Sequence, residues 1–385
     1  MKHQFFSLIV LNILLVVLLV SCTVGPLSFA ADPAGRLLRP YENKTLSEPD
    51  FVDYTVARYY YAGLSDIQQQ AYRIIYNAVF SFPEKILLPG VSETQLSEVM
   101  RALKYDNPHI VFLSGTYQYY AGSGMNYLIP SYLFSAKEAQ TKIRQMMKTA
   151  RRIAEDASEQ PDTFSKELYI HDALCEKCAY ASGANADTAY GALIQGQAVC
   201  EGYSLGAKLL FDLAGIQSFV VMGKASAPET PETTHMWNVL QVDGDWYYLD
   251  CTWDDPVVSD GASFVRHAYF NPTPEKLESN HYAFTLPADI VCSGVENNYF
   301  RRFSLYCTAE NWRQTVERGL AEAENAPGAE FCFETAALMR EAVGTLVRNG
   351  ELSAYFGGKE ISDLHYTTDA DVCAVYFHFG TGDPA

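Results

Sequence analysis

Cys200 stands directly before a run of residues with helical periodicity. In the segment GQAVCEGYSLGAKLLFDLAGI, at 196–216, leucines recur at the spacing of one helix face, and Gly215 is typical of a helix end. A cysteine at a helix N-terminus lies near unpaired N–H groups and the positive end of the helix dipole. Both favour the nucleophilic thiolate and can stabilise an oxyanion. Taken alone, a cysteine in this place is more often a small apolar residue.

The segment THMWNVLQVDGDWYYLDCTWDDP, at 234–256, has the alternation of a β-hairpin. Its Asp243-Gly244 pair is typical of a two-residue turn, which sets the register of the two strands. Because side chains alternate along a strand, extending this register predicts that four of them share one face. These four are His235, Trp237, Asp250 and Thr252, with His235 opposite Thr252 and Trp237 opposite Asp250.

His235 and Asp250 are diagonal neighbours in this register and within reach of a hydrogen bond. A carboxylate that holds one imidazole nitrogen fixes the tautomer and leaves the other nitrogen for a thiol. Each residue alone is better explained as structural. Together they predict a catalytic arrangement in which Cys200 is the nucleophile, His235 the base and Asp250 the residue that orients it.

The same two segments resemble the bacterial transglutaminase-like superfamily. That family has a cysteine opening a helix, a histidine in H-x-W-N and an aspartate in W-Y-x-x-D-x-T-W-D-D-P, which Cys200, His235 and Asp250 match. TAYGALIQGQ before Cys200 and HAYFNPTPEKL after the hairpin also look like the family, so the resemblance covers about 164–280.

The resemblance implies a papain-like α+β fold, in which a helix that bears the cysteine packs on an antiparallel sheet that bears the histidine and aspartate. It implies thiol acyl chemistry on amides. Water as acceptor gives a peptidase or amidase, and an amine gives a crosslink. Trp237 is a candidate wall of the site, and Gln197 is a candidate contributor to an oxyanion hole. No metal or other cofactor is predicted, since the Asp254-Asp255 pair lacks an EF-hand pattern.

The N-terminus has the pattern of an export signal, with Lys2 and His3 before an apolar run at 5–20. Two ends are predicted with equal weight. A bacterial lipobox would lipidate Cys22, whereas cleavage after Ala30 would release a free protein; an uncleaved anchor is a third alternative. Each places the rest of the chain outside the cytoplasm, secreted or anchored at a bacterial cell surface. Residues 31–50 read as a linker.

The composition of the 385-residue chain narrows the function further. A net charge of −18 argues against electrostatic binding of nucleic acid. The predicted partner is a peptide or protein amide, with cell-wall peptide inferred from location alone. The sequence leaves the oligomeric state open.

Three regions are predicted after the linker: an N-terminal helical and Tyr-rich hairpin region at 51–160, a catalytic domain at 161–297, and a small α+β module at 298–385. The hairpin consists of two aromatic strands around 121–124. Its tyrosines are best explained by ordinary sheet packing, although a non-catalytic module that binds the cell envelope is the rival class of function. In the module, the order is strand, helix, a strand at 354–356, and a last strand.

Eight cysteines follow Cys22, and their pairing cannot be read from the sequence. Cys175 and Cys178 are three positions apart in a predicted helix and therefore share one helix face. As a zinc half-site they lack a second close pair, and as a redox motif they lack a preceding strand. We expect a buried apolar pair or a local disulfide, and a structural role for His171 on the same helix.

Overall fold

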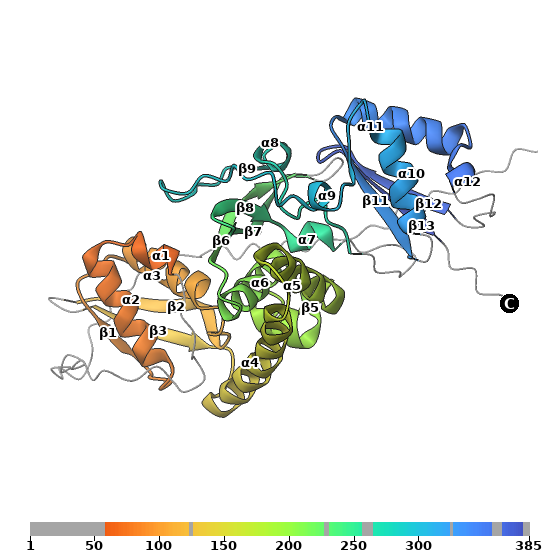
Figure 1. Cartoon of the computed structure of the whole chain (residues 1–385). Coiled ribbons are helices and arrows are strands. Elements are labelled where there is room, and N and C mark those ends of the chain that lie inside the picture. Colours follow the sequence, from red (N-terminus) through yellow and green to blue (C-terminus); the bar gives the residue numbers. More distant parts are fainter. Residues whose placement is uncertain are drawn as a thin grey trace, which may run out of the picture. The chain divides into compact units, whose positions relative to one another are not determined.

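A computed structural model describes residues 58–122, 126–226, 231–255, 265–323, 326–355 and 364–379. The predicted signal, Cys22 and the linker lie outside the described residues. The described chain has an α+β fold, as predicted, with three sheets of three or four strands and one two-stranded pair (Figure 1). Within these ranges, every helix is either too short or too polar to cross a membrane.

The N-terminal region combines short helices with a three-stranded sheet in the order β1-β3-β2. Its elements are α1 (Tyr59–Ala62), α2 (Asp66–Val79), β1 (Ile86–Leu88), α3 (Glu93–Asp106), β2 (Leu113–Ala121) and β3 (Asn126–Tyr132). A capping box of Ser92 and Gln95 opens α3, and the helix ends before Asn107. Tyr119 donates a hydrogen bond of 2.6 Å to the Val91 carbonyl, which supports ordinary packing of the hairpin.

The central part packs three helices together and places one of them on an antiparallel sheet. The helices are α4 (Ala136–Ser158), α5 (Thr163–Lys177) and α6 (Cys200–Leu213), and the sheet has the order β8-β7-β6-β9. Its strands are β6 (Ser218–Ala225), β7 (Thr233–Val242), β8 (Asp245–Leu249) and β9 (His281–Tyr282). Although α4 precedes the predicted boundary at 160, it packs on α5 and α6. The division into domains stays a prediction.

The helix α6 is buried along almost its whole length. Residues 202–212 are all buried, including Lys208, whose ammonium pairs with the Asp212 carboxylate one turn further on. The helix ends as predicted, since Gly215 has a φ of 75°, in the left-handed region that glycine accepts. Because α6 contacts both β6 and β7 as well as α4 and α5, the residue at its start has a fixed position.

Short elements connect these parts. They are β4 (Ala179–Tyr180), the π-helical turn η1 (Gly191–Gln195), β5 (Gln197–Ala198), α7 (Cys251–Asp254) and α8 (Pro274–Leu277). β4 and β5 pair in parallel, and β5 directly precedes α6.

The C-terminal module has a four-stranded sheet in the order β10-β11-β13-β12. Its elements are α9 (Tyr299–Arg302), β10 (Tyr306–Cys307), α10 (Trp312–Glu322), β11 (Gly328–Phe333), α11 (Ala336–Val343), η2 (Gly344–Arg348), α12 (Leu352–Tyr355), β12 (Leu364–Asp369) and β13 (Ala374–Phe379). The prediction of a strand at 354–356 is wrong. After Gly350, at a φ of 76°, the chain forms the helical turn α12 and buries Leu352 in the core of the module.

We expect Gly202→Ala to destabilise the protein strongly. A Cβ at this position would lie 2.2 Å from the Ala186 carbonyl oxygen and 2.8 Å from the Ala198 Cβ, so the backbone around α6 must move. Overpacking of this kind costs about 1–3 kcal/mol or more. The matched control is Gly206→Ala on the same helix, where the nearest atom is 3.2 Å away and helix propensity compensates. Thermal unfolding should show a much larger fall in Tm for Gly202→Ala, and equal Tm values would contradict this packing.

Candidate active site

Cys200 is the first residue of α6, as the sequence predicts. The preceding Val199 is extended, with φ −95° and ψ 176°, so the chain enters the helix directly from β5. Gly196, at a φ of 69°, makes the turn that leads into β5. Cys200 is partly exposed, whereas the other cysteines of the described chain are buried, and none of these is in a disulfide. The most exposed cysteine among the described residues is therefore the predicted nucleophile.

The hairpin has the predicted register. Val242 pairs with Asp245, Asn238 pairs with Leu249, and the strands join through the left-handed φ values of Asp243 (52°) and Gly244 (97°). His235 lies on β7, and Asp250 directly follows β8. The Nε2 atom of His235 donates a hydrogen bond to Asp250 Oδ2 at 2.6 Å. The structure therefore brings these two predicted residues together at the end of the hairpin.

The β7–β8 pairing ends at Asn238 and Leu249, so the predicted pairs of Trp237 with Asp250 and of His235 with Thr252 do not form, and this part of the predicted register is wrong. The strand β8 ends at Leu249, and Asp250 becomes the N-cap of α7. Its Oδ1 atom accepts hydrogen bonds from the backbone N–H groups of Thr252 at 2.9 Å and Trp253 at 3.4 Å. An aspartate that caps a helix turns the chain out of the strand. One oxygen of Asp250 thus holds α7 while the other holds His235.

His281 is a third member of this group that the sequence did not reveal. Its Nε2 atom lies 3.0 Å from Asp250 Oδ2, the same oxygen that binds His235, and its Nδ1 atom lies 2.6 Å from Asn280 Oδ1. It belongs to β9, a two-residue strand that pairs with β6. A strand of this length has no alternation of side chains to read, so no sequence signal indicated it.

The charges in this group reinforce one another. Burial lowers the pKa of His235, but the Asp250 carboxylate outweighs this effect and, with the hydrogen bond to the Cys200 thiol, raises it to about 10. Burial alone would raise the pKa of Asp250, yet His235 and His281 hold it well below its usual range. Since Nε2 of His235 is bound to Asp250, Nδ1 is the nitrogen left for Cys200.

Three further side chains surround the group. Trp237 is fully buried, with its ring centroid 6.0 Å from that of His235 and 5.0 Å from that of His281, so it supports both rings from the sheet. Gln197 lies on β5 with its side chain exposed, three residues before Cys200. Their roles in substrate or oxyanion binding stay predictions. Tyr180 on β4 is 46% exposed. Its partial burial raises its pKa, and the nearby Cys200 and Asp250 raise it further.

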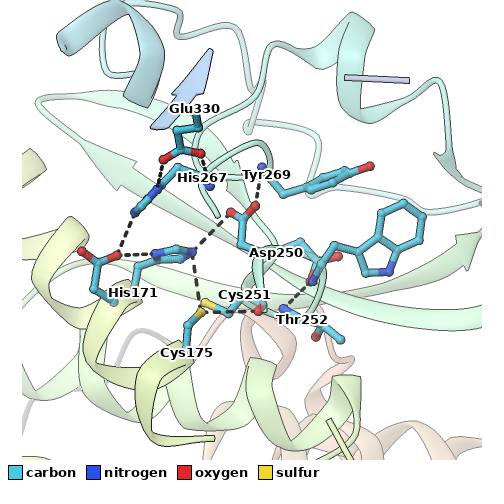
Figure 2. A network of polar contacts seen from close by, with 11 residues as sticks. His171, Cys175, Asp250, Cys251, Thr252, His267, Tyr269 and Glu330 are labelled. Atoms are coloured by element: carbon cyan, nitrogen blue, oxygen red, sulfur yellow. Dashed lines mark hydrogen bonds and ion pairs between the residues drawn. The ribbon is translucent and has the colours of Figure 1, made fainter. Parts of the chain in front are cut away.

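Two separate clusters in the described chain have the composition of metal ligands. In one, His235, Asp250 and His281 lie with their ligand atoms within 4.8 Å of one another, but the hydrogen bonds above already use these atoms. In the other, the ligand atoms of His171, Cys175 and Cys251 also lie within 4.8 Å of one another (Figure 2). Asp172 and His267 adjoin His171 in the same way. In this cluster His171, Asp172 and Cys175 lie on α5, Cys251 begins α7, and His267 follows α7 in the chain.

Residues 148–251 match the family model of the transglutaminase-like superfamily. The matched segment contains Cys200, His235 and Asp250, so the predicted resemblance to this family and the predicted transglutaminase-like α+β core are confirmed. No curated protein matches the chain at a significant level.

Solved structures add a distant likeness. A TGase crystal structure is 14% identical with a TM-score of 0.25, covering 44% of this chain and 50% of that one. A candidate cysteine protease from Cytophaga hutchinsonii is 14% identical with a TM-score of 0.26, covering 48% and 80%. The periplasmic domain of TgpA from Pseudomonas aeruginosa, bound to ethylmercury, is 14% identical with a TM-score of 0.23, covering 44% and 71%. The chain spans half the length of the TGase, and likeness at this level carries no functional inference.

We expect Cys200 to be the most reactive thiol of the folded protein. Burial raises the pKa of Cys178, Cys292 and Cys307 to about 12 and protects them, whereas Cys200 is partly exposed beside His235. Limiting iodoacetamide at mildly acidic pH, followed by peptide mapping, should label Cys200 first. Cys200→Ala should abolish the fast phase of iodoacetamide labelling. Labelling of any buried cysteine before Cys200 would contradict this expectation.

The His235–Asp250 pair should make stability fall at alkaline pH. The pKa of His235 is raised from 6.5 to about 10 on folding, so its contribution is fully present below about pH 6.5 and lost as the pH rises to about 10. Within this window the slope is on the order of 1 kcal/mol per pH unit. Calorimetric Tm values should fall more steeply in the wild type than in His235→Gln, which cannot carry the charge. Parallel curves would show that His235 is not charged.

Proposed function

We propose that the protein is an exported thiol acyl-transfer enzyme that acts on amide bonds as a cysteine peptidase or amidase. The observation that carries the proposal is the 2.6 Å contact between His235 Nε2 and Asp250 Oδ2, in a transglutaminase-like core whose single partly exposed described cysteine opens α6. This arrangement supplies a nucleophile, a base and an orienting carboxylate from three neighbouring elements.

In the first step, His235 is already charged and holds the proton from the Cys200 thiol on Nδ1, and the Cys200 sulfur attacks the carbonyl carbon of the amide. The tetrahedral oxyanion is stabilised by backbone N–H groups at the start of α6, with Gln197 as a further candidate donor. The imidazolium then gives its proton to the amide nitrogen, the C–N bond breaks, and the amine leaves. Asp250 keeps the ring in one orientation and stabilises its charge throughout.

In the second step, an acceptor attacks the thioester on Cys200, and His235 takes the acceptor's proton. The carbon–sulfur bond breaks, and the proton on His235 returns to the sulfur of Cys200. Water as acceptor gives a carboxylic acid, and an amine gives a new amide. We favour water, because it is present at about 55 M, while an amine must be bound and oriented to compete. Efficient transfer would need a surface that positions an amine and keeps water out.

The location of the enzyme is part of the proposal. The N-terminal pattern of 1–30 supports export, with lipid attachment at Cys22 or release after Ala30 as alternatives. An envelope location makes peptides, including cell-wall peptides, the substrates to test first. N-terminal sequencing of the mature protein should find Cys22 or Ala31, and an intact Met1 on cytoplasmic protein would exclude export.

The experiment is mass spectrometry of peptide mixtures incubated with the purified protein, with and without a primary amine. We expect new carboxyl termini or side-chain acids that are absent with Cys200→Ala. Asp250→Asn should reduce turnover on the order of 10³-fold or more, because the amide can hold the wrong histidine tautomer. Products that are mostly amine-linked would make the protein a crosslinking enzyme.

The control is the variant Gly206→Ala, which leaves the catalytic side chains in place and should keep full turnover. No product in either condition, together with an unreactive Cys200, would favour the rival class of a non-catalytic envelope-binding module.

A further inference from the structure

The cluster of His171, Cys175 and Cys251 lies outside the proposed chemistry. His171 and Cys175 occupy one face of α5, one turn apart, and Cys251 begins α7. The Nε2 atom of His171 lies 3.7 Å from the Cys175 sulfur, and the three ligand atoms lie within 4.8 Å of one another. All three side chains are buried. In a tetrahedral zinc site, bonds of 2.0–2.3 Å place neighbouring ligand atoms about 3.3–3.8 Å apart, so the cluster is close to that size.

Asp254, on the same short helix as Cys251, points at this cluster. Its Oδ1 atom accepts a hydrogen bond of 2.9 Å from the backbone of Tyr269, and its Oδ2 atom is fully buried. This Oδ2 lies 3.3 Å from Nε2 of His171. Asp254 therefore contacts the histidine of the cluster and adds a negative charge beside it, without being one of the three ligand atoms that lie within 4.8 Å of one another.

The tautomer of His171 strengthens the case. Its Nδ1 atom lies 2.9 Å from Asp172 Oδ1 and must donate to that carboxylate, which His267 also holds at 3.0 Å (Figure 2). A neutral imidazole with its proton on Nδ1 presents a lone pair at Nε2. The Nε2 atom lies 3.3 Å from Asp254 Oδ2 and 3.7 Å from the Cys175 sulfur, so either a proton on Nε2 or a metal ion occupies the space between these atoms. A carboxylate that fixes the far nitrogen of a ligand histidine is the usual support of a zinc site.

We propose that His171, Cys175 and Cys251 bind a structural zinc ion that joins α5 to α7, with the Asp254 carboxylate beside them. Two thiolates and an imidazole are ligands that zinc prefers. Binding releases the two thiol protons to solvent as the Zn–S bonds form, so affinity falls at acidic pH. The sequence predicted no metal because Cys175 and Cys178 lack a second close pair, but the structure supplies the partners of Cys175 from α7.

The ion would also act on the proposed active site without touching substrate. Cys251 directly follows Asp250, whose Oδ1 caps α7 through Thr252 and Trp253. A bond between Cys251 and an ion on α5 would fix the first turn of α7, and with it the carboxylate that holds His235. In this site the ion is a positioning group, and its ligands are positioning residues.

The test uses the full chain, purified under reducing conditions without chelator, and measures zinc by elemental mass spectrometry. We expect about one zinc per chain. Cys175→Ala and Cys251→Ala should each lose it, while two matched controls should keep it: Cys178→Ala, a buried cysteine at the end of the same helix, and Cys200→Ala at the proposed nucleophile. Zinc that persists in Cys175→Ala but is lost in Cys200→Ala would place the metal elsewhere and overturn the proposal.

A second readout needs no variant that could fail to fold. Metal-free wild-type protein titrated with Co²⁺ should show sulfur-to-cobalt charge-transfer bands and the visible bands of a tetrahedral site, saturating at about one Co²⁺ per chain. Absence of these bands in reduced protein would overturn the proposal. So would a Cys175–Cys251 disulfide, found by non-reducing peptide mapping, in protein that takes up no metal after reduction. Neither readout depends on turnover.

Discussion

The carboxylate of Asp250 connects the hairpin to the helices. Its Oδ1 caps α7, and its Oδ2 accepts hydrogen bonds from His235 and His281. A buried carboxylate is costly unless its lone pairs are satisfied and its charge is balanced. Here two imidazoles and two backbone N–H groups satisfy the lone pairs of Asp250, and the charged ring of His235 balances its negative charge. The end of β8, the direction of α7 and the orientation of His235 all follow from where this one side chain finds its partners.

The sequence was sufficient for the features that local rules determine. The Asp243-Gly244 turn specified the register of the hairpin, and the leucine spacing with Gly215 specified α6 from its first residue to its last. These local signals placed Cys200, His235 and Asp250. The extension to Thr252 failed because the aspartate that ends the strand also caps a helix, and strand alternation contains no information on that choice.

What the sequence could not predict depends on contacts between distant segments. His281 and Asp250 are far apart in the chain and meet only because a two-residue strand pairs with β6. Cys175 has its partners on α7, which no spacing pattern in α5 indicates. In the C-terminal module, the segment at 354–356 has the composition of a strand, yet burial of Leu352 favours a helical turn. Tertiary packing decides such short elements.

The burial of α6 has a consequence for how a substrate is received. Any rotation or sliding of this helix would drive Gly202 against the Ala186 carbonyl, where there is no room even for a Cβ atom. The nucleophile at its first residue is therefore held in its reacting position before anything binds. The entropy that a flexible site would lose on engaging its substrate has already been lost during folding. Adaptation to substrates of different shape must then come from the rim, where exposed side chains such as Tyr180 can change rotamer while the sulfur stays still.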